Sequence, residues 1–194
     1  MEATTPDLPR CAWCLGSDIY KAYHDDEWGW PQHDDHVLFE FLILEGAQAG
    51  LSWSTILNKR DGYRRVFAQF DALKLSGWSD EKLGSALLDV GIVRNRLKVW
   101  SVRTNARAFL AVQEELGSFD RYLWNWVGGE PLLNHWNELK QVPPRTELSD
   151  RLSKDLLKRG FKFVGSTIVY AYLQAMGVVN DHLTSCHRHP ACGA

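Results

Sequence analysis

Cysteine and histidine residues gather toward the two ends of this 194-residue sequence. All four cysteines lie there, and so do six of the seven histidines. The opening residues contain no apolar segment like that of a secretion signal, so we expect a reducing, cytoplasmic location, where such residues bind metals more often than they form disulfides. His182 and Cys186 are four residues apart and would share one face of a helix. Two ligands from the N-terminal segment would complete the tetrahedral Cys₂His₂ set typical of zinc.

The spacing does not decide which two residues of the N-terminal segment are the metal ligands. Cys11 and Cys14 form a CxxC pair, and Cys11 with His24 is the alternative. Zinc deaminases also use such ligands, but they carry HxE and PCxxC elements. Here Arg10 precedes Cys11, and no glutamate stands two positions after His24. The deaminase signature is therefore absent, as are the alternating strands of a deaminase sheet.

Composition and charge restrict the class of protein. Hydrophobic residues make up 45% of the chain, enough for a folded core, and no apolar run reaches the roughly 18 residues of a membrane helix. The net charge is −2, yet residues 1–50 hold two basic and ten acidic side chains, whereas residues 51–194 hold twenty basic and fourteen acidic ones. A basic face for nucleic acid near residues 140–170 is one interpretation, and an ordinary solvated helix face is the other.

Helical spacing of apolar residues recurs along the chain, and no segment shows the alternation of a strand. Asp34 or Asp35 can cap a helix whose apolar residues run from Val37 to Leu44. Gly128–Thr146, rich in glycine and proline, is predicted to be a loop near a boundary between two lobes. The sequence predicts an all-α fold, with further helices over residues 51–59, 62–70, 80–90, 94–116, 120–127, 148–159 and 166–176.

Two glycines, Gly160 and Gly165, bracket a short turn between the last two predicted helices. Glycine can adopt the positive φ that a tight reversal needs. Ser166 and Thr167 open the next helix, whose free N–H groups and dipole favour an anion such as a DNA phosphate, and Lys162 adds charge. A plain helix–helix turn is the alternative, and from spacing alone the commoner one.

Several longer stretches resemble the 3-methyladenine-DNA glycosylase I family of the helix-hairpin-helix glycosylase superfamily. The resemblance covers roughly residues 10–188, which it implies to be a single domain of two helical lobes around a base pocket, with residues 1–9 and 189–194 as tails. It also implies a zinc site that joins the N- and C-terminal segments. The stretches that carry it are Arg10–Trp13, Tyr20–Gly29, Leu38–Trp53, Asp89–Arg94, Asn105–Ala108, Lys158–Gly165 and Val179–His182.

For the metal, the resemblance implies one structural zinc ion held by Cys11, His24, His182 and Cys186. Such a site is closed, with no position left for a reacting water. Cys14 and Cys192 would then be bystanders.

For activity, the resemblance implies hydrolytic removal of 3-methyladenine from alkylated double-stranded DNA, with the base flipped into a pocket and released as free 3-methyladenine. Glu45 would be the catalytic residue and would bind the adenine edge. The pocket walls would be Trp13, Tyr23, Trp28 and Trp53, the wedge that fills the gap in DNA would be Gly50 and Leu51, and the backbone contacts would be Lys162, Gly165, Ser166 and Thr167. We expect a monomer with no membrane contact.

At one position that bears on the chemical step, this sequence differs from related glycosylases. Many related glycosylases carry a catalytic aspartate after the hairpin, and Asn180 stands at the comparable position, with Asp181 one residue later. No lysine stands out as a nucleophile, so we expect a monofunctional enzyme that leaves an abasic site. A zinc-organised DNA-binding module without catalysis and a glycosylase for another base are the alternatives. The remaining tryptophans are expected in the core: Trp78, Trp100, Trp124, Trp126 and Trp136.

Overall fold

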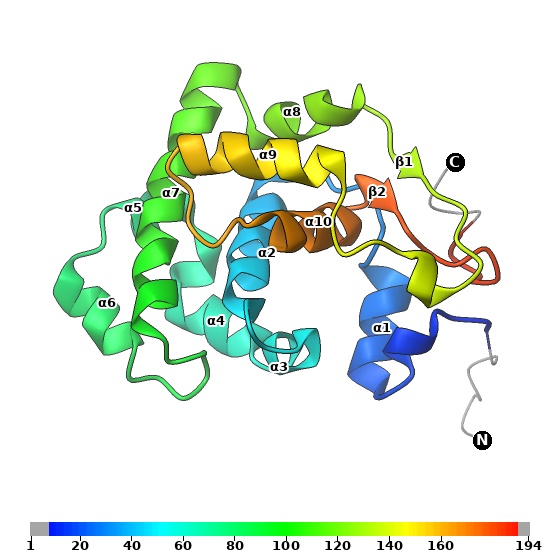
Figure 1. The fold of residues 1–194 in the computed structure, drawn as a ribbon. Helices are drawn as coiled ribbons and strands as arrows, with labels where there is room; N and C mark the ends of the chain where they lie inside the picture. Colours follow the sequence, from blue (N-terminus) through cyan, green and yellow to red (C-terminus); the bar gives the residue numbers. More distant parts are fainter. Residues whose placement is uncertain (1–7, 190–194) are drawn as a thin grey trace.

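The structure, a computed structural model, describes residues 8–189 and is almost entirely helical (Figure 1). The α-helices are α1 (Asp18–Asp26), α2 (Asp35–Gln48), α3 (Trp53–Leu57), α4 (Arg60–Val66), α5 (Ala72–Ser76), α6 (Asp80–Ala86), α7 (Arg96–Leu116), α8 (Phe119–Trp124), α9 (Glu147–Lys158) and α10 (Ser166–Ala175). Single 3₁₀ turns cover Ala12–Cys14, Ala68–Phe70, Asn125–Val127 and Leu139–Gln141. The prediction of an all-α fold is confirmed in its main features.

Helix α2 runs through the centre of the molecule and contacts α3, α7, α8 and α10 (Figure 1). Every residue from Leu38 to Ala47 is buried, since apolar residues surround the helix on all sides and Glu40 and Glu45 are the only charged residues in this range. Asp34 caps it by accepting a hydrogen bond from the backbone N–H of His36. Asp35, the other candidate cap, instead accepts from the backbone N–H groups of Phe119 and Asp120 and so joins α2 to α8.

Helix boundaries follow local signals where the helix is long. Asn95 caps α7, and Gly117, at φ 90°, ends it, close to the predicted range. The helix predicted over residues 62–70 is wrong in its second half, because Ala68, Gln69 and Phe70 all have positive φ and form a separate turn. Helices α1 and α5 were not predicted, because α1 has nine residues and α5 only five, too few for an apolar spacing to repeat over several turns.

A two-stranded parallel pairing joins β1 (Leu132–Leu133) to β2 (Val179–Asn180). The expectation that the chain has no strands was therefore wrong in this detail. Two residues are too few to show the alternation by which a strand is predicted. The pairing attaches the loop after α8 to the segment after α10 (Figure 1).

The tryptophans expected in the core divide into three groups. Trp78 and Trp124 are buried, as predicted. Trp100 and Trp126 are half-buried and pack against the edge of the core. For Trp136 the prediction was wrong, because its indole N–H donates to the Asp181 carboxylate instead of lying among apolar side chains.

The N-terminal turn and α1 lie beside the last segment of the described chain (Figure 1). The backbone N–H of His187 donates to the carbonyl of Pro9, and that of Leu183 reaches the Cys11 sulfur. Among residues 8–189, no helix combines the length and the apolar character that crossing a membrane requires. The cytoplasmic location expected from the sequence stays a prediction.

Candidate active site and metal cluster

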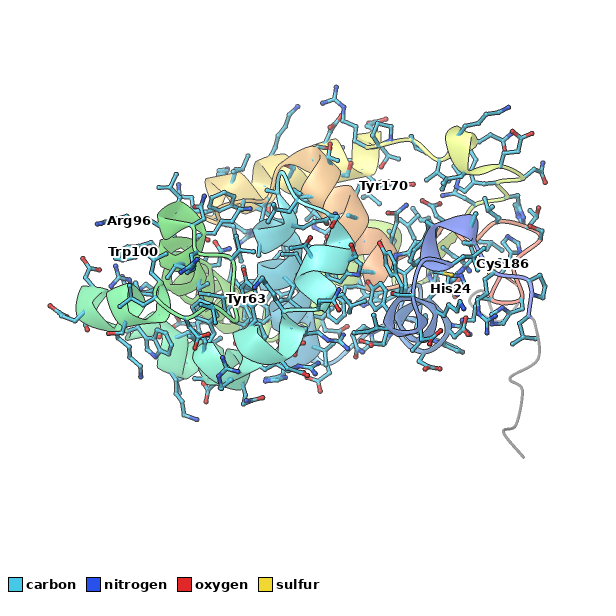
Figure 2. All side chains as sticks on the ribbon, turned by 90° about the horizontal axis from the view of Figure 1, so that it is seen from below. His24, Tyr63, Arg96, Trp100, Tyr170 and Cys186 are labelled. Atoms are coloured by element: carbon cyan, nitrogen blue, oxygen red, sulfur yellow. The ribbon has the colours of Figure 1, made fainter. Side chains whose placement is uncertain are left out.

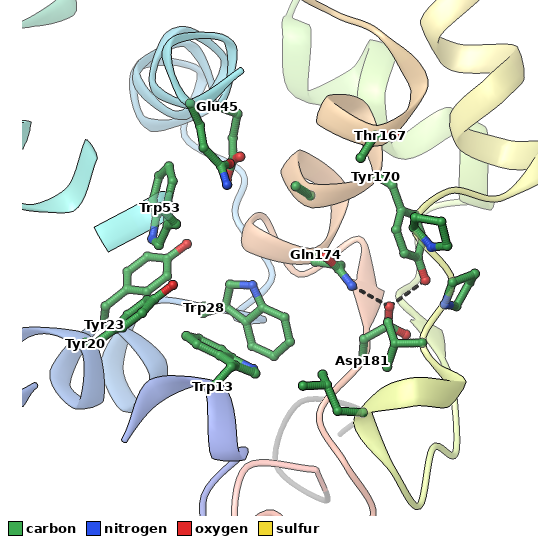
Figure 3. A pocket seen from close by; sticks show the side chains of 16 residues that line it. Trp13, Tyr20, Tyr23, Trp28, Glu45, Trp53, Thr167, Tyr170, Gln174 and Asp181 are labelled. Atoms are coloured by element: carbon green, nitrogen blue, oxygen red, sulfur yellow. Dashed lines mark hydrogen bonds between the residues drawn. The ribbon is translucent and has the colours of Figure 1, made fainter. Parts of the chain in front are cut away.

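A cavity of about 440 Å³ opens between α1, α2, α3, α10 and the loop that precedes α9 (Figure 3). Its volume is within the range of small-molecule sites, about 300–1,000 Å³. All five base-pocket residues expected from the sequence line it. The full lining is Trp13, Tyr20, Tyr23, Trp28, Glu45, Gln48, Trp53, Leu139, Val142, Pro143, Pro144, Thr167, Tyr170, Ala171, Gln174 and Asp181.

Helical spacing brings most of these side chains to one place. Tyr20 and Tyr23 are one turn apart on α1, and Glu45 and Gln48 are one turn apart on α2. Residues three and four apart face the same side of a helix. On α10 the lining residues follow the same rule, at positions 167, 170, 171 and 174.

Aromatic rings form one side of the cavity (Figure 3). The rings of Tyr23 and Trp53 lie 5.4 Å apart at 43°. Those of Trp13 and Trp28 lie 5.0 Å apart at 70°. Ring faces bind flat ligands by stacking, and they attract a cation with about 0.5–2 kcal/mol when water is excluded.

Glu45 places a carboxyl group in this aromatic surrounding. Its side chain is 3% exposed, and its Oε2 atom is buried without a hydrogen-bond partner. Burial raises the pKa of Glu45 to about 8. The indole N–H of Trp53, which lines the same cavity, is also buried without a partner. Buried polar atoms are rarely left unpaired, so this pair is suited to receive a polar ligand edge.

Asp181 lies on the opposite side of the cavity and is held by four side chains. Its Oδ1 accepts hydrogen bonds of 2.7 Å from the Asn134 amide and the Trp136 indole. Its Oδ2 accepts from the Tyr170 hydroxyl at 2.5 Å and the Gln174 amide at 2.7 Å (Figure 3). Burial and the contact with Asp181 raise the pKa of Tyr170.

Asn180, the residue expected at the position of a catalytic aspartate in related glycosylases, does not line the cavity. The carboxylate that lines the cavity is Asp181. Asn180 is fully buried, and its Oδ1 accepts a hydrogen bond from the backbone N–H of His182. The strand that ends at Asn180 turns Asp181, not Asn180, toward α10.

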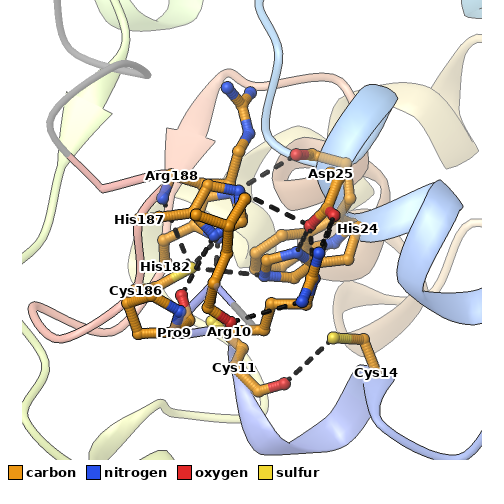
Figure 4. A network of polar contacts seen from close by, with 12 residues as sticks. Pro9, Arg10, Cys11, Cys14, His24, Asp25, His182, Cys186, His187 and Arg188 are labelled. Carbon is orange, nitrogen blue, oxygen red and sulfur yellow. Dashed lines mark hydrogen bonds and ion pairs between the residues drawn. The ribbon is translucent and has the colours of Figure 1, made fainter. Parts of the chain in front are cut away.

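A second group lies beside the cavity: Cys11, His24, His182 and Cys186, all buried, with their ligand atoms within 4.8 Å of one another (Figure 4). The sulfur-to-nitrogen distances are 3.7 Å for Cys11–His182, 3.4 Å for Cys186–His24 and 3.5 Å for Cys186–His182. Around a tetrahedral ion with bonds of about 2.3 Å to sulfur and 2.0 Å to nitrogen, such atoms lie roughly 3.5 Å apart. The four residues therefore fit a metal ion of this kind.

Neighbouring groups orient both imidazoles. His24 Nδ1 lies 2.8 Å from the Asp25 carboxylate, which leaves Nε2 facing Cys186. Asp25 is itself bound by the Arg10 guanidinium at 2.8 Å (Figure 4). His182 uses Nε2 for the carbonyl of Trp28 and presents Nδ1 to the sulfurs. Such partners of metal-binding histidines set the ring orientation and the tautomer.

The CxxC alternative is not the arrangement found. Cys14 is buried outside the group of four, and its thiol donates to the carbonyl of Cys11 at 3.1 Å. Burial raises the pKa of Cys14 to about 11, so this thiol stays protonated. Cys192 lies outside the described residues.

The turn between α9 and α10 differs from expectation in one respect. Gly160, at φ 96°, takes the left-handed conformation, but Gly165 has φ −62° and the second left-handed residue is Phe163. Asn105 of α7 holds the turn, since its side chain bonds both the N–H and the carbonyl of Lys162. No side chain caps α10 at Gly165, and Thr167 in its first turn lines the cavity.

The remaining predicted site residues lie on the surface or at the cavity rim. Gly50 and Leu51 are exposed between α2 and α3, with Leu51 42% exposed. Lys162 is exposed beside α7, and Ser166 is half-buried, with its hydroxyl 2.8 Å from that of Ser149.

Sequence reasoning missed Tyr20, Gln48, Tyr170, Gln174 and Asp181 as lining residues. Tyr20 and Gln48 carry a usable signal, because each is three residues from a predicted site residue on the same helix. For Asp181 the only signal in the sequence was its position beside His182, a predicted metal ligand. Tyr170 and Gln174 could have been predicted from Thr167, because they lie three and seven residues after it on the same face of α10.

An almost entirely helical frame around an aromatic cavity with an unpaired carboxyl group is suited to a flat, base-sized ligand. A family model for methyladenine glycosylases matches residues 13–189. The DNA-3-methyladenine glycosylase 1 of Escherichia coli K12 is 44% identical over 94% of this chain and 98% of its own length. A solved 3-methyladenine DNA glycosylase I superposes with a TM-score of 0.91 at 46% identity, over 93% of this chain and 100% of that one.

The chain belongs to the methyladenine glycosylase family. A Staphylococcus aureus relative, solved in a study of 3-methyladenine recognition, is 33% identical and has the same TM-score of 0.91 over 94% of this chain and 97% of its own. The resemblance found in the sequence is thereby confirmed, and an enzyme is favoured over a binding module without catalysis.

Proposed function

We propose that this chain is a DNA repair glycosylase that hydrolyses the bond between 3-methyladenine and deoxyribose in alkylated DNA. The observation that carries the proposal is the Glu45 carboxyl group, buried without a partner for Oε2 among aromatic rings. Ionised, it can accept a hydrogen bond from the amino group of an adenine edge. Its relatives named for 3-methyladenine support the same base.

The substrate explains the site's chemistry. 3-Methyladenine attached to the sugar is a cation, and it departs as a neutral base, so the bond to be broken is already weak. The site then needs selectivity more than acid catalysis. Stacking on Tyr23, Trp53 and Trp13 favours a cationic ring over a neutral base, and the charge of Glu45 stabilises it further.

In this proposal the base reaches the cavity by flipping out of the DNA helix. We assign α9, the 160–165 turn and α10 as the helix-hairpin-helix that binds the DNA backbone, with the open N–H groups of α10 facing a phosphate. Leu51 is the wedge. The cavity lies between a lobe with α2–α7 and a segment with α1, which fits the two-lobe domain proposed for residues 10–188.

For the metal, we infer one zinc ion held by Cys11, His24, His182 and Cys186. The donor set of two sulfurs and two nitrogens fits zinc, and it leaves no coordination position free. Its role is structural: it would join the N-terminal turn that carries Trp13 to the segment that carries Asp181.

Asp181 does not have the freedom of a general base, because four donors engage both of its oxygens. We assign Asp181 the role of orienting the side chains of Tyr170 and Gln174. No lysine lines the cavity among residues 8–189, which supports the monofunctional reaction that leaves an abasic site. Strand nicking by the purified protein at the modified site, without heat or added lyase, would contradict it.

The deciding experiment is the release of bases from DNA treated with a methylating agent, separated by chromatography. Release of mainly 3-methyladenine is expected. Release of mainly 7-methylguanine would favour a related glycosylase for another base, and no release would contradict the proposal. A monomeric state, to be measured by light scattering, stays a prediction.

A further inference from the structure

Lys98 lies in the first turn of α7 and reaches across to the end of α2. Its ammonium group donates hydrogen bonds to two backbone carbonyls, that of Ala47 at 2.8 Å and that of Ala49 at 2.6 Å. Its stem lines a small internal space with Tyr63 and Val99. Burial lowers the pKa of Lys98. Lys98 is therefore a half-buried side chain that is held at two points.

The carbonyls that Lys98 binds are ones that a helix cannot satisfy by itself. The last carbonyls of an α-helix have no partner in the helix and carry the negative end of its dipole. A cation from a second helix therefore stabilises the end of α2. Lys98 is itself positioned by Asn95, whose side chain accepts from the backbone N–H of Lys98 at 3.1 Å.

The chain turns sharply just after these carbonyls. Gly50 has φ 77°, and the N–H of Leu51 donates to the carbonyl of Gln48 at 2.6 Å. Ser52 then caps α3, whose first residue, Trp53, lines the cavity. The turn that carries Leu51 is thus attached to the cavity wall on one side and to α7 on the other. Figure 2 shows this end of α7, marked by Arg96 and Trp100, far from the metal cluster marked by His24 and Cys186.

We propose that Lys98 is a positioning residue: by holding the Ala49–Leu51 turn in place, it sets the position from which Leu51 enters the DNA helix. The proposal rests on the proposed function, in which Leu51 is the wedge. Lys98 acts through the backbone of Ala49, so it is required for excision from duplex DNA and not for binding of the free base. Lysine suits this task because its compact ammonium can serve two converging carbonyls.

The test compares Lys98→Met with a matched control, Lys59→Met. The Lys59 ammonium also donates to a backbone carbonyl, that of Val90 at 2.7 Å, but away from the turn. In Lys98→Met we expect excision of 3-methyladenine from duplex DNA to fall about 10- to 100-fold, since a small displacement of a contacting group has effects of this size. The affinity for free 3-methyladenine should change less than about two-fold, and Lys59→Met should leave both unchanged.

A double-mutant cycle with Leu51→Ala separates positioning from a general structural role. If Lys98 acts through Leu51, Lys98→Met causes almost no further loss of excision in a Leu51→Ala background. Independent losses that multiply, or an equal loss of free-base binding, would overturn the proposal. Should Lys98→Met fold poorly, Lys98→Arg keeps the charge with a wider head and should show the same pattern with a smaller loss.

Different results would contradict the proposed function and the proposed role of Lys98. If the unaltered protein releases no 3-methyladenine, the proposed function fails. If it releases the base and Leu51→Ala is impaired while Lys98→Met acts at the normal rate, the wedge stands and the role of Lys98 is wrong.

Discussion

Asp181 and His182 are adjacent in the chain, and their side chains serve two different structures: Asp181 lines the cavity and His182 enters the metal cluster. Tyr23 and His24 on α1 repeat the arrangement. The cluster and the cavity therefore share the same short pieces of backbone. Displacement of one imidazole would be passed on to the neighbouring cavity wall through a single peptide unit.

Removal of the metal should weaken both stability and base binding. In Cys186→Ser we expect loss of bound zinc, a lower melting temperature and reduced affinity for 3-methyladenine, because closed zinc sites contribute directly to folding. Elemental analysis and thermal unfolding measure this. Cys14→Ser is the control, since its thiol lies outside the cluster. Zinc lost in Cys14→Ser and kept in Cys186→Ser would restore the CxxC alternative.

Replacement of the cavity carboxyl should separate chemistry from DNA binding. A cationic base in the cavity favours the ionised form of Glu45, whereas Glu45→Gln keeps the shape and cannot carry the charge, so we expect release of 3-methyladenine to fall roughly 100-fold, the size of effect found when one stabilising group is removed. Binding of duplex DNA should change only a few-fold. Equal losses of folding and DNA binding would show that Glu45 has a structural role.

Stability should depend on pH through the same group. The pKa of Glu45 is raised from 4.5 in an exposed carboxyl to about 8 in the folded protein. Between these values the folded chain holds a proton that the unfolded chain has lost, so the free energy of unfolding falls as pH rises from 4.5 to 8. Thermal unfolding from pH 5 to 9 should show Glu45→Gln gaining stability relative to the unaltered protein as pH rises. A difference that is constant with pH would contradict the raised pKa.

Asp181→Asn tests the orientation of the cavity's second polar wall. Asparagine keeps only one acceptor oxygen, so two of the four donors that Asp181 binds, which include Tyr170 and Gln174, would face an NH₂ group and the wall should lose its alignment. We expect about 10-fold weaker base release, read from single-turnover assays, with stability also reduced. Asp155→Asn is a matched control, because Asp155 accepts from the Tyr122 hydroxyl at 2.8 Å, and neither residue lines the cavity. Equal effects of both changes on base release would argue against a role for Asp181 in the site.

The two glycines of the hairpin should respond differently to alanine. Gly160, at φ 96°, adopts a conformation unfavourable for other residues, so Gly160→Ala should lower stability by about 1 kcal/mol or more. At Gly165, with φ −62°, an added Cβ meets no atom within 4 Å. Gly165→Ala should leave the melting temperature nearly unchanged and weaken DNA binding, since only an approaching phosphate needs that space. Unchanged DNA affinity in Gly165→Ala would contradict the assigned contact.

The sequence predicted the parts of the site that follow a regular spacing or a long motif. The central helix with Glu45, the turn between α9 and α10 and the cluster of Cys11, His24, His182 and Cys186 are of this kind. It could not predict the wall formed by Asp181, because that wall depends on donors from residues 134, 136, 170 and 174 that meet only in the folded chain. The three residues with positive φ after α4 were also beyond prediction, since none is a glycine and no local signal marks them.

The attachment of Cys11 to a partner 171 residues later has a consequence for how the protein is made. At a translation rate of about 5–20 residues per second, the N-terminal thiols wait roughly 10–30 s on the ribosome before His182 exists. During that interval the N-terminal turn that carries Trp13 lacks the C-terminal segment that the cluster joins to it. A chain that ended between α10 and residue 181 would keep both helices of the last turn but lack Asp181 and the two C-terminal members of the cluster, and so would have an incomplete base pocket.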